Sequence, residues 1–273
     1  MALVGFLGVN ALIIALCIIG LWLISLRVRD VSFIDSWWPV GMVVLAWVSF
    51  LQSGEPSPRR LLLVGLCTAW GLRLGVYLFW RWRKHGPDRR YVTMLGLAQK
   101  ERGWGFATSS LLLVFALQAP LQFVVCLPAQ LGQFGKVSGD IGPIASAGAA
   151  LAIIGIAFES IGDWQLTRFK ADPGNAGKVL DSGLWRFTRH PNYFGDACVG
   201  WGLFLIAAES PLGLWSLPAP ALLTFLLTRW SGVPTVEGRM RRQRPDYEAY
   251  VQRTSSFIPW PPKTAAQGAS PDP

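Results

Sequence analysis

Long apolar stretches recur along this chain and constrain its fold more than any other feature of the sequence. A helix needs about 20 predominantly apolar residues to cross a hydrocarbon core of about 30 Å. About seven stretches approach or exceed that length, and we expect spans at 3–26, 33–51, 61–80, 107–127, 141–158, 193–208 and 211–227. The sequence therefore predicts an all-α, polytopic integral membrane protein.

The composition agrees with a membrane environment. Hydrophobic residues make up 52% of the chain and charged residues 15%, and the mean hydropathy is +0.37. A soluble domain of 273 residues would expose too much of this apolar surface to water. We expect one membrane domain over residues 1–262, followed by a disordered tail over residues 263–273.

The basic residues predict the direction in which the chain crosses the membrane. Of the 25 Lys and Arg residues, only Arg73 falls inside an expected span. If the N-terminus is outside, Arg59, Arg60 and Lys136 lie on the outer side and all the others on the cytoplasmic side. Because Lys and Arg gather in cytoplasmic loops, we expect an outer N-terminus and a cytoplasmic C-terminus. Topology thus accounts for the net charge of +9, and we expect no nucleic-acid partner.

The cysteines and histidines argue against a metal site. All four cysteines fall in apolar spans, with no CxxC pair, and His85 and His190 are the only histidines. Buried cysteines of this kind usually behave as small hydrophobic residues. We therefore expect no metal ion.

The basic segment at residues 236–262, VEGRMRRQRPDYEAYVQRTSSFIPWPP, follows the last expected span. Its composition predicts a short basic helix at the membrane interface that ends at Pro259.

Ionisable side chains at membrane depth point to a function, because each costs at least a few kcal/mol there. The residues of this kind are Asp35, Arg73, Glu159, Asp163 and Asp196. Several fall at helical spacing with other polar residues, namely Trp70–Arg73–Tyr77, Glu159–Asp163 and Asn192–Asp196. Such spacing predicts a polar pocket that opens to the cytoplasm. Structural ion pairing is the less favoured alternative for any single residue.

This pocket suits a large anionic cofactor that carries a ribose. Arg and Lys can bind its phosphates, while Asp and Asn can bind the sugar hydroxyls. The chain has neither GxGxxG after a strand nor GxxxxGK[ST], so helices must hold the cofactor. Topology and anionic lipid are the alternative explanation of the cytoplasmic arginines.

The run FESIGDWQLTRFKADPGNAGKVLDSGLWRFTRHPNYFGDACVGWGLFLIA resembles the C-terminal signature of the membrane steroid 5α-reductase family. The likeness is greatest to its bacterial branch, formerly catalogued as a domain of unknown function. It extends to FIDSWWP, WGLRLGVYLFWRW and DRRY upstream, and to GVPTVEGRM and FIPW downstream, so it covers residues 33–260.

The resemblance implies a seven-helix enzyme that uses NADPH to reduce the 4,5 double bond of a 3-oxo-4-ene steroid or a similar hydrophobic enone. By position, the resemblance assigns the cofactor site to Arg73, Tyr77, Asp163, Arg168, Lys170, Lys178, Asn192, Tyr193 and Asp196. The implied partners are this substrate and membrane lipid.

The resemblance also implies an acidic residue and a tyrosine that polarise the substrate carbonyl. The acid matches Asp35, but Trp70 stands where the family has the tyrosine. An indole N–H can donate a hydrogen bond yet cannot deliver a proton. Either Asp35 is therefore the acid, in its protonated form, or Tyr91 folds back to help.

Two rival functions remain open from the sequence. A membrane methyltransferase that uses S-adenosylmethionine shares the RHPNYFG stretch, but such enzymes usually carry paired glutamates where this chain has Glu237 and Gly238. A non-catalytic lipid-binding protein explains the spans but not the constellation between Asp163 and Asp196.

Overall fold

The computed structural model describes residues 2–135 and 140–263. Lys136 lies outside them, and so does the expected tail except for its first residue, Lys263, whose backbone N–H donates to the Arg253 carbonyl. The described residues are helical, and the only strand-like pairing among them is an isolated bridge between Thr188 and Ser255. Two compact units are present, Met1–Ala149 with Leu203–Ala219 and Ala150–Gly202 with Pro220–Pro273. We call them unit 1 and unit 2.

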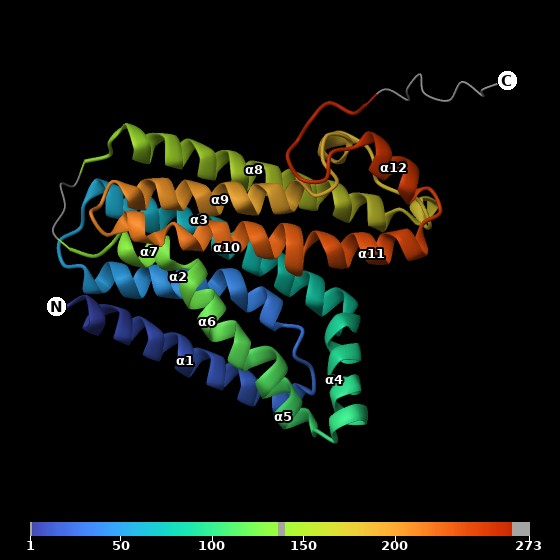
Figure 1. The fold of residues 1–273 in the computed structure, drawn as a ribbon, viewed down its shortest axis with the longest axis horizontal. Coiled ribbons are helices and arrows are strands. Elements are labelled where there is room, and N and C mark those ends of the chain that lie inside the picture. The colour runs from blue at the N-terminus through green and yellow to red at the C-terminus, as the bar shows by residue number, and fades with distance from the viewer. Residues whose placement is uncertain (1, 136–139, 264–273) are drawn as a thin grey trace. The chain divides into compact units, whose positions relative to one another are not determined.

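Unit 1 holds the N-terminal helices, in blue and green in Figure 1. They are α1 (Leu3–Val28), α2 (Ile34–Gln52), α3 (Pro58–His85), α4 (Arg89–Arg102), α5 (Phe106–Ser110), the π-helix η1 (Leu111–Phe115), α6 (Ala116–Val125) and α7 (Leu127–Leu131). The short 3₁₀-helix η4 (Gly213–Ser216) also belongs to this unit. Figure 1 shows α4 running at a steep angle to α3.

Unit 2 holds most of the C-terminal half. Its elements are the 3₁₀-helices η2 (Pro173–Asn175) and η3 (Gly183–Arg186), the π-helix η5 (Leu226–Trp230), α11 (Val233–Gln243) and α12 (Tyr247–Arg253). Three further helices carry residues of both units: α8 (Pro143–Ala171), α9 (Pro191–Ala208) and α10 (Pro218–Phe225).

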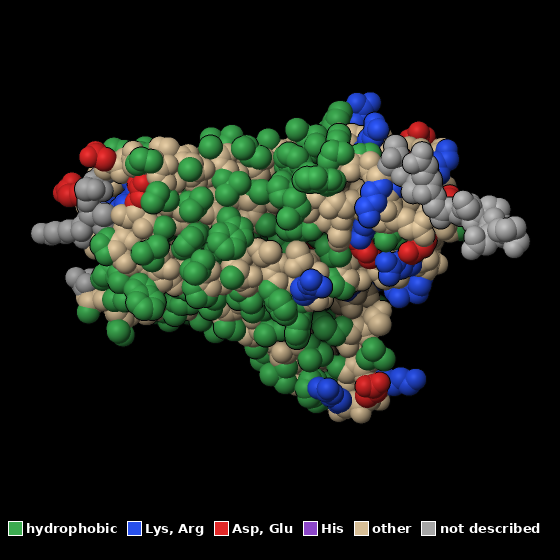
Figure 2. Space-filling model, turned by 45° about the horizontal axis from the view of Figure 1, so that its top comes forward, with side chains coloured by type: hydrophobic (Ala, Val, Ile, Leu, Met, Phe, Trp, Pro, Cys, Tyr) green, Lys and Arg blue, Asp and Glu red, His purple; other side chains and the backbone are tan. Residues whose placement is uncertain are grey.

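Five helical segments are long and apolar enough to cross a membrane. They are Leu3–Val28, Ile34–Gln52, Pro58–His85, Phe106–Val125 and Pro143–Ala171. These candidate spans match the first five expected ones, as befits an integral membrane protein. Figure 2 shows broad areas of hydrophobic side chains on the visible face, as expected for a surface that contacts lipid.

The expected C-terminal basic helix is wrong in its extent. Instead of one helix that ends at Pro259, the structure has α11 and α12, and α12 ends at Arg253. Pro245 explains the break, because a proline disfavours helical geometry in the residue before it. Arg244 accordingly has an extended backbone, with φ −134° and ψ 106°.

A buried polar network joins α1, α2 and α7 inside unit 1. The Asn10 amide nitrogen donates to Ser49 Oγ at 2.8 Å and to Gln130 Oε1 at 2.9 Å. Gln52 Nε2 in turn donates to Asn10 Oδ1 at 2.8 Å. Polar residues between membrane helices hydrogen-bond one another, so this network selects one alignment of the three helices.

Close contact between α2 and α3 depends on two glycines of α3. Gly71 and Gly75 lie one helical turn apart and face α2, so no side chain separates the two backbones. A Cβ atom at Gly71 would lie 2.7 Å from the carbonyl oxygen of Pro39, which is far too close. Small residues four apart are a common device for close packing of membrane helices.

We predict that Gly71→Ala destabilises the protein, because the added methyl group must push α2 and α3 apart. The expected loss is about 1 to 3 kcal/mol, measured as unfolding in detergent. Gly65→Ala on the same helix is the matched control, since nothing lies within 4 Å of its added Cβ. A Gly65→Ala loss equal to that of Gly71→Ala would refute the proposed role of the contact.

Candidate functional site

Asp35, in the first turn of α2, is the centre of a polar cluster in unit 1. Tyr91 Oη donates to Asp35 Oδ1 at 2.6 Å, and Arg90 Nη2 donates to Asp35 Oδ2 at 2.7 Å. Arg90 also donates to both carboxylate oxygens of Asp88. The structure thus brings together two residues that the sequence analysis treated as alternatives, and it adds Arg90, which that analysis did not single out.

Local sequence explains how α4 reaches Asp35. Gly86, with φ 74°, ends α3, and Asp88 then caps α4 by accepting a hydrogen bond from the Arg90 N–H at 2.8 Å. The backbone N–H of Asp88 donates to Ser32 Oγ at 2.7 Å. The start of α4 is therefore held against the residues that precede α2.

Burial and a neighbouring charge favour the neutral, protonated form of Tyr91. Burial of the ring and the negative charge of Asp35 raise the pKa of the Tyr91 phenol well above its ordinary value. Burial alone would lower the pKa of Arg90, but its bond to Asp88 and the charge of Asp35 raise that pKa overall. A neutral phenol, a guanidinium and two carboxylates therefore share this corner of unit 1.

The other predicted residues of unit 1 lie on α3. Trp70 is buried beside Gly71, where α3 packs on α2. Tyr77 stacks on Trp80 with 6.2 Å between ring centroids, and the Arg81 guanidinium lies 6.0 Å from the Tyr77 ring. Arg73 lies on the same helix, between Trp70 and Tyr77.

In unit 2, close packing of α8 on α9 determines where the predicted cofactor residues of these two helices lie. A Cβ atom at Gly195 would lie 2.5 Å from the carbonyl oxygen of Gly155 and 2.7 Å from the backbone nitrogen of Glu159. Gly162 also faces the start of α9 but less tightly, since its added Cβ would lie 3.2 Å from Pro191 Cγ and 3.4 Å from the Asn192 nitrogen. Only glycine permits this approach of the two helices.

This packing brings Asp163 and Asn192 together. Asn192 Nδ2 donates to Asp163 Oδ1 at 3.4 Å, a long hydrogen bond, and the Asp163 side chain is buried. Asp196 follows Asn192 by one helical turn, and Tyr193 stacks on His190 with 5.4 Å between centroids. A carboxylate and an amide are thus held side by side.

The predicted basic residues of unit 2 are exposed. Arg168 and Lys170 occupy the last turn of α8, where cations are favourable, and Lys178 follows η2. The Arg168 guanidinium lies 5.1 Å from the ring of Trp164. These side chains have the charge and access needed to bind an anion from the solvent.

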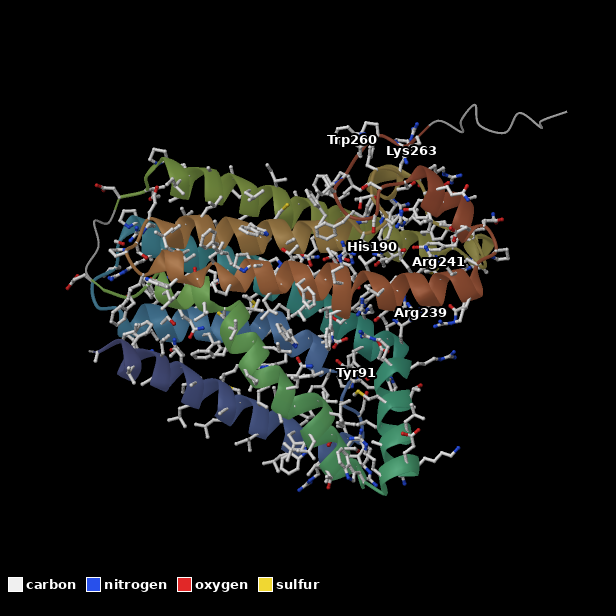
Figure 3. All side chains as sticks on the ribbon, in the orientation of Figure 1. Tyr91, His190, Arg239, Arg241, Trp260 and Lys263 are labelled. Atoms are coloured by element: carbon white, nitrogen blue, oxygen red, sulfur yellow. The ribbon has the colours of Figure 1, made fainter. Side chains whose placement is uncertain are left out.

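A buried ionic cluster lies just before α9, and the sequence analysis did not anticipate it. Arg189 Nε donates to Glu237 Oε1 at 2.8 Å, and His190 Nε2 lies 3.1 Å from the same oxygen. Arg189 Nη1 also donates to the Thr254 carbonyl at 2.5 Å. Figure 3 labels His190 within this part of the molecule.

This cluster joins three segments that are distant in sequence: the approach to α9, α11 and the C-terminal residues. It therefore holds the start of α9, where Asn192 and Tyr193 lie. Burial alone would raise the pKa of Glu237, but hydrogen bonds from His190 and Arg189 lower it to about 2. Arg189 and His190 belong to the RHPNYFG stretch, which the sequence already marked as a motif. Nothing in the local sequence indicated that Glu237 would be their partner.

Comparisons with known proteins agree with a family assignment over most of the chain. The family described as "Protein of unknown function (DUF1295)" matches residues 21–254. An uncharacterized protein of Schizosaccharomyces pombe, C594.04c, is 21% identical over 272 residues, which cover 88% of this chain and 75% of that protein. No solved structure matches the chain.

We predict that Glu237→Gln destabilises unit 2, because it leaves Arg189 as a buried charge without its carboxylate. Breaking a buried pair in this way costs about 3 to 5 kcal/mol, measured as thermal unfolding in detergent. Glu248→Gln is the matched control, because it breaks an ion pair that is exposed. Glu248 Oε2 lies 3.4 Å from Arg241 Nε, and both side chains are exposed. The control should change stability by less than about 1 kcal/mol.

We also predict that the destabilisation by Glu237→Gln depends on pH. The pKa of Glu237 is lower in the folded protein than its ordinary value of 4.5, so its charge stabilises the fold above about pH 4.5. That stabilisation is lost as the pH falls from about 4.5 towards 2. The stability difference between wild type and Glu237→Gln should therefore shrink over this range, and a constant difference would contradict the role of the charge.

Proposed function

The chain belongs to the DUF1295 family, and within it we propose a membrane reductase that uses NADPH to reduce the 4,5 double bond of a 3-oxo-4-ene steroid or a similar hydrophobic enone. The observation that carries this proposal is the cluster of Asp35, Arg90 and Tyr91. In this cluster the neutral Tyr91 hydroxyl donates to Asp35, which also binds Arg90. Asp35 lies at the start of the apolar candidate span Ile34–Gln52.

Reduction of an enone needs a donor at the carbonyl oxygen. When bound, NADPH would supply a hydride equivalent, and hydride addition at the β-carbon would place negative charge on the carbonyl oxygen. In our proposal the Tyr91 O–H stabilises that negative charge, because a donor aimed at a developing oxyanion lowers the barrier. Proton transfer from Tyr91 to that oxygen would give the enol, solvent would return the proton to Tyr91, and tautomerisation with a second solvent proton would complete the C–H bond at the α-carbon.

Asp35 and Arg90 are positioning residues in this scheme. Asp35 accepts one hydrogen bond from each partner, which suits a carboxylate rather than a protonated acid. It therefore fixes the orientation of the phenol, while Arg90 fixes the carboxylate. Trp70 provides apolar surface and an indole N–H, but no proton.

The cofactor assignment rests on the chemistry of the residues in unit 2. Asp163 and Asn192 suit ribose hydroxyls, and exposed Arg168, Lys170 and Lys178 suit phosphates. Tyr193 and Asp196 continue this set along α9. Arg73 and Tyr77 of α3 enter the cofactor assignment through the family resemblance alone.

We further propose seven spans, with the N-terminus outside and the cofactor residues on the cytoplasmic side. In this proposal α9 is the sixth span and the helical run of α10 and η5 is the seventh, in addition to the five candidate spans. The distribution of Lys and Arg supports this orientation, because basic loops stay in the cytoplasm.

We expect Tyr91→Phe to lower kcat for enone reduction by about 10² to 10³-fold, the usual effect of removing one oxyanion donor. The affinity for NADPH should not change. Asp35→Asn and Asp35→Leu should also slow the reaction, because each removes the carboxylate that orients Tyr91. Product formation from a 3-oxo-4-ene steroid, followed by mass spectrometry, measures the rate.

Arg90→Gln and Arg89→Gln form a matched pair for this experiment. Arg90 binds Asp35 and Asp88, whereas Arg89 is its exposed neighbour. Only the first variant should reduce the rate. If Tyr91→Phe reduces the enone at the wild-type rate while Asp35→Leu is inactive, Asp35 is the acid and our assignment of the donor is wrong.

For the cofactor, Arg168→Ala and Asn192→Ala should each weaken NADPH binding by about 1 to 3 kcal/mol, with the charged residue at the upper end. Isothermal titration of the detergent-solubilised protein measures this change. Lys100→Ala removes an exposed cation of unit 1 and should have no effect. Equal affinity in all three variants would refute the site, and binding of S-adenosylmethionine in place of NADPH would favour a methyltransferase.

A further inference from the structure

The chain beyond α12 forms a strap over residues 254–263 that is fixed to the rest of unit 2. The backbone N–H of Trp260 donates to the Phe187 carbonyl, and the backbone N–H of Lys263 donates to the Arg253 carbonyl, both at 2.9 Å. Backbone hydrogen bonds at both positions give the strap a defined path. Its side chains therefore occupy defined places on the surface of unit 2.

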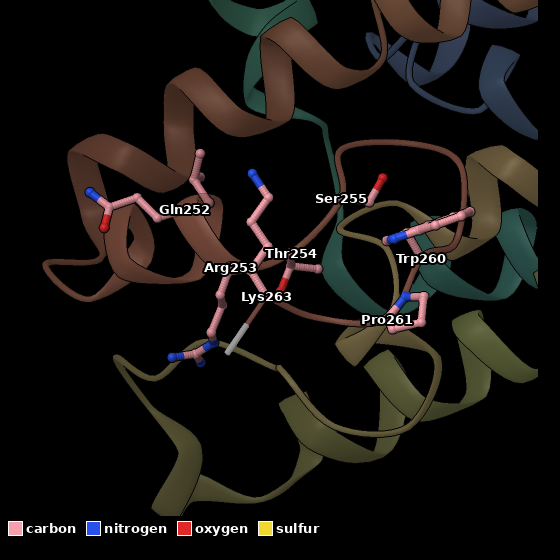
Figure 4. Close-up of a pocket in the computed structure, with 8 residues that line it drawn as sticks. Gln252, Arg253, Thr254, Ser255, Trp260, Pro261 and Lys263 are labelled. Atoms are coloured by element: carbon pink, nitrogen blue, oxygen red, sulfur yellow. The ribbon is translucent and has the colours of Figure 1, made fainter. Parts of the chain in front are cut away.

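This strap and the end of α12 enclose a surface cavity of about 260 Å³ (Figure 4). Arg253, Thr254 and Ser255 line the cavity together with Trp260 and Lys263. The volume is below the roughly 300 to 1,000 Å³ typical of pockets for whole small-molecule ligands. It suits a single polar group rather than a dinucleotide.

The polar lining of the cavity is suited to an anion. Arg253 pairs with Asp181, whereas Lys263 is exposed and pairs with no carboxylate among the described residues. Thr254 is 4% exposed, and its hydroxyl has no hydrogen-bond partner within the described parts of the chain. A buried hydroxyl of this kind costs free energy unless a ligand or water satisfies it.

The apolar side chains of the strap indicate where that anion comes from. Trp260 is 69% exposed and Ile258 is 65% exposed. Figure 3 labels Trp260 and Lys263 at the same outer edge of unit 2, and both line the cavity. Tryptophan next to lysine is the pairing found where a protein meets the headgroup region of a bilayer.

From this geometry we infer that the strap binds the phosphate headgroup of an anionic phospholipid. The phosphate lies in the cavity beside Lys263, and one of its oxygens accepts a hydrogen bond from the Thr254 hydroxyl. The acyl chains remain in the bilayer next to Trp260 and Ile258. This lipid site is independent of the proposed cofactor residues and of the reductase activity.

Native mass spectrometry of the full-length protein in detergent tests the inference. The delipidated protein is titrated with phosphatidylglycerol or with phosphatidylcholine. We expect one phosphatidylglycerol to bind more tightly than phosphatidylcholine. Lys263→Gln should weaken its binding about fivefold, the effect of one basic residue near an anionic surface. Trp260→Ala should also weaken binding, whereas Lys263→Arg should retain it.

Lys100→Gln is the matched control, because it removes an exposed cation elsewhere and should leave binding unchanged. Glycerol 1-phosphate competition separates lipid from free phosphate. The inference predicts that this soluble headgroup displaces the lipid only at far higher concentration. Equal binding of the two lipids, wild-type binding by Lys263→Gln and Trp260→Ala, or equal affinity for glycerol 1-phosphate would each overturn the inference.

Discussion

Polar groups on helices that lie in hydrocarbon have no water to bind, and this constraint organises both units. Each buried polar side chain must find its partner within the protein or pay a large desolvation cost. Asn10, on a candidate span, meets Ser49 and Gln130, and Arg189 meets Glu237 where burial outside the spans also excludes water. These contacts determine which helices lie together, because the apolar surfaces of membrane helices fit many neighbours equally well.

Glycine contacts set how closely those helices approach, and the candidate sites depend on that distance. In unit 1, Gly71 lets α3 lie against the backbone of α2, the helix that carries Asp35. In unit 2, Gly195 lets α9 lie against α8, so that Asn192 reaches Asp163. Side chains on close, rigid helices keep their positions, which is what a site for precise chemistry requires.

Part of the candidate site was predictable from local pattern. Asp35 and the i, i+4 pairs of α8 and α9 stand out because charged residues are rare in apolar runs. Tyr91 was recognised only as an alternative donor, since its contact with Asp35 spans 56 positions. The roles of Arg90 and Glu237 were missed, because basic and acidic residues outside the spans carry no local sign of their partners. Pro245 could have shown that the C-terminal helix divides.

The sequence by itself determined the helical class of this protein and its five candidate spans, because both depend on the length and hydropathy of continuous segments. It also carries membership of the DUF1295 family, whose match covers residues 21–254. Tertiary structure alone decided which polar residues share a cluster and where α4, α11 and α12 lie. Those choices depend on shape, close backbone contact and hydrogen bonding between segments as much as 120 positions apart, as in the bond from Asn10 to Gln130.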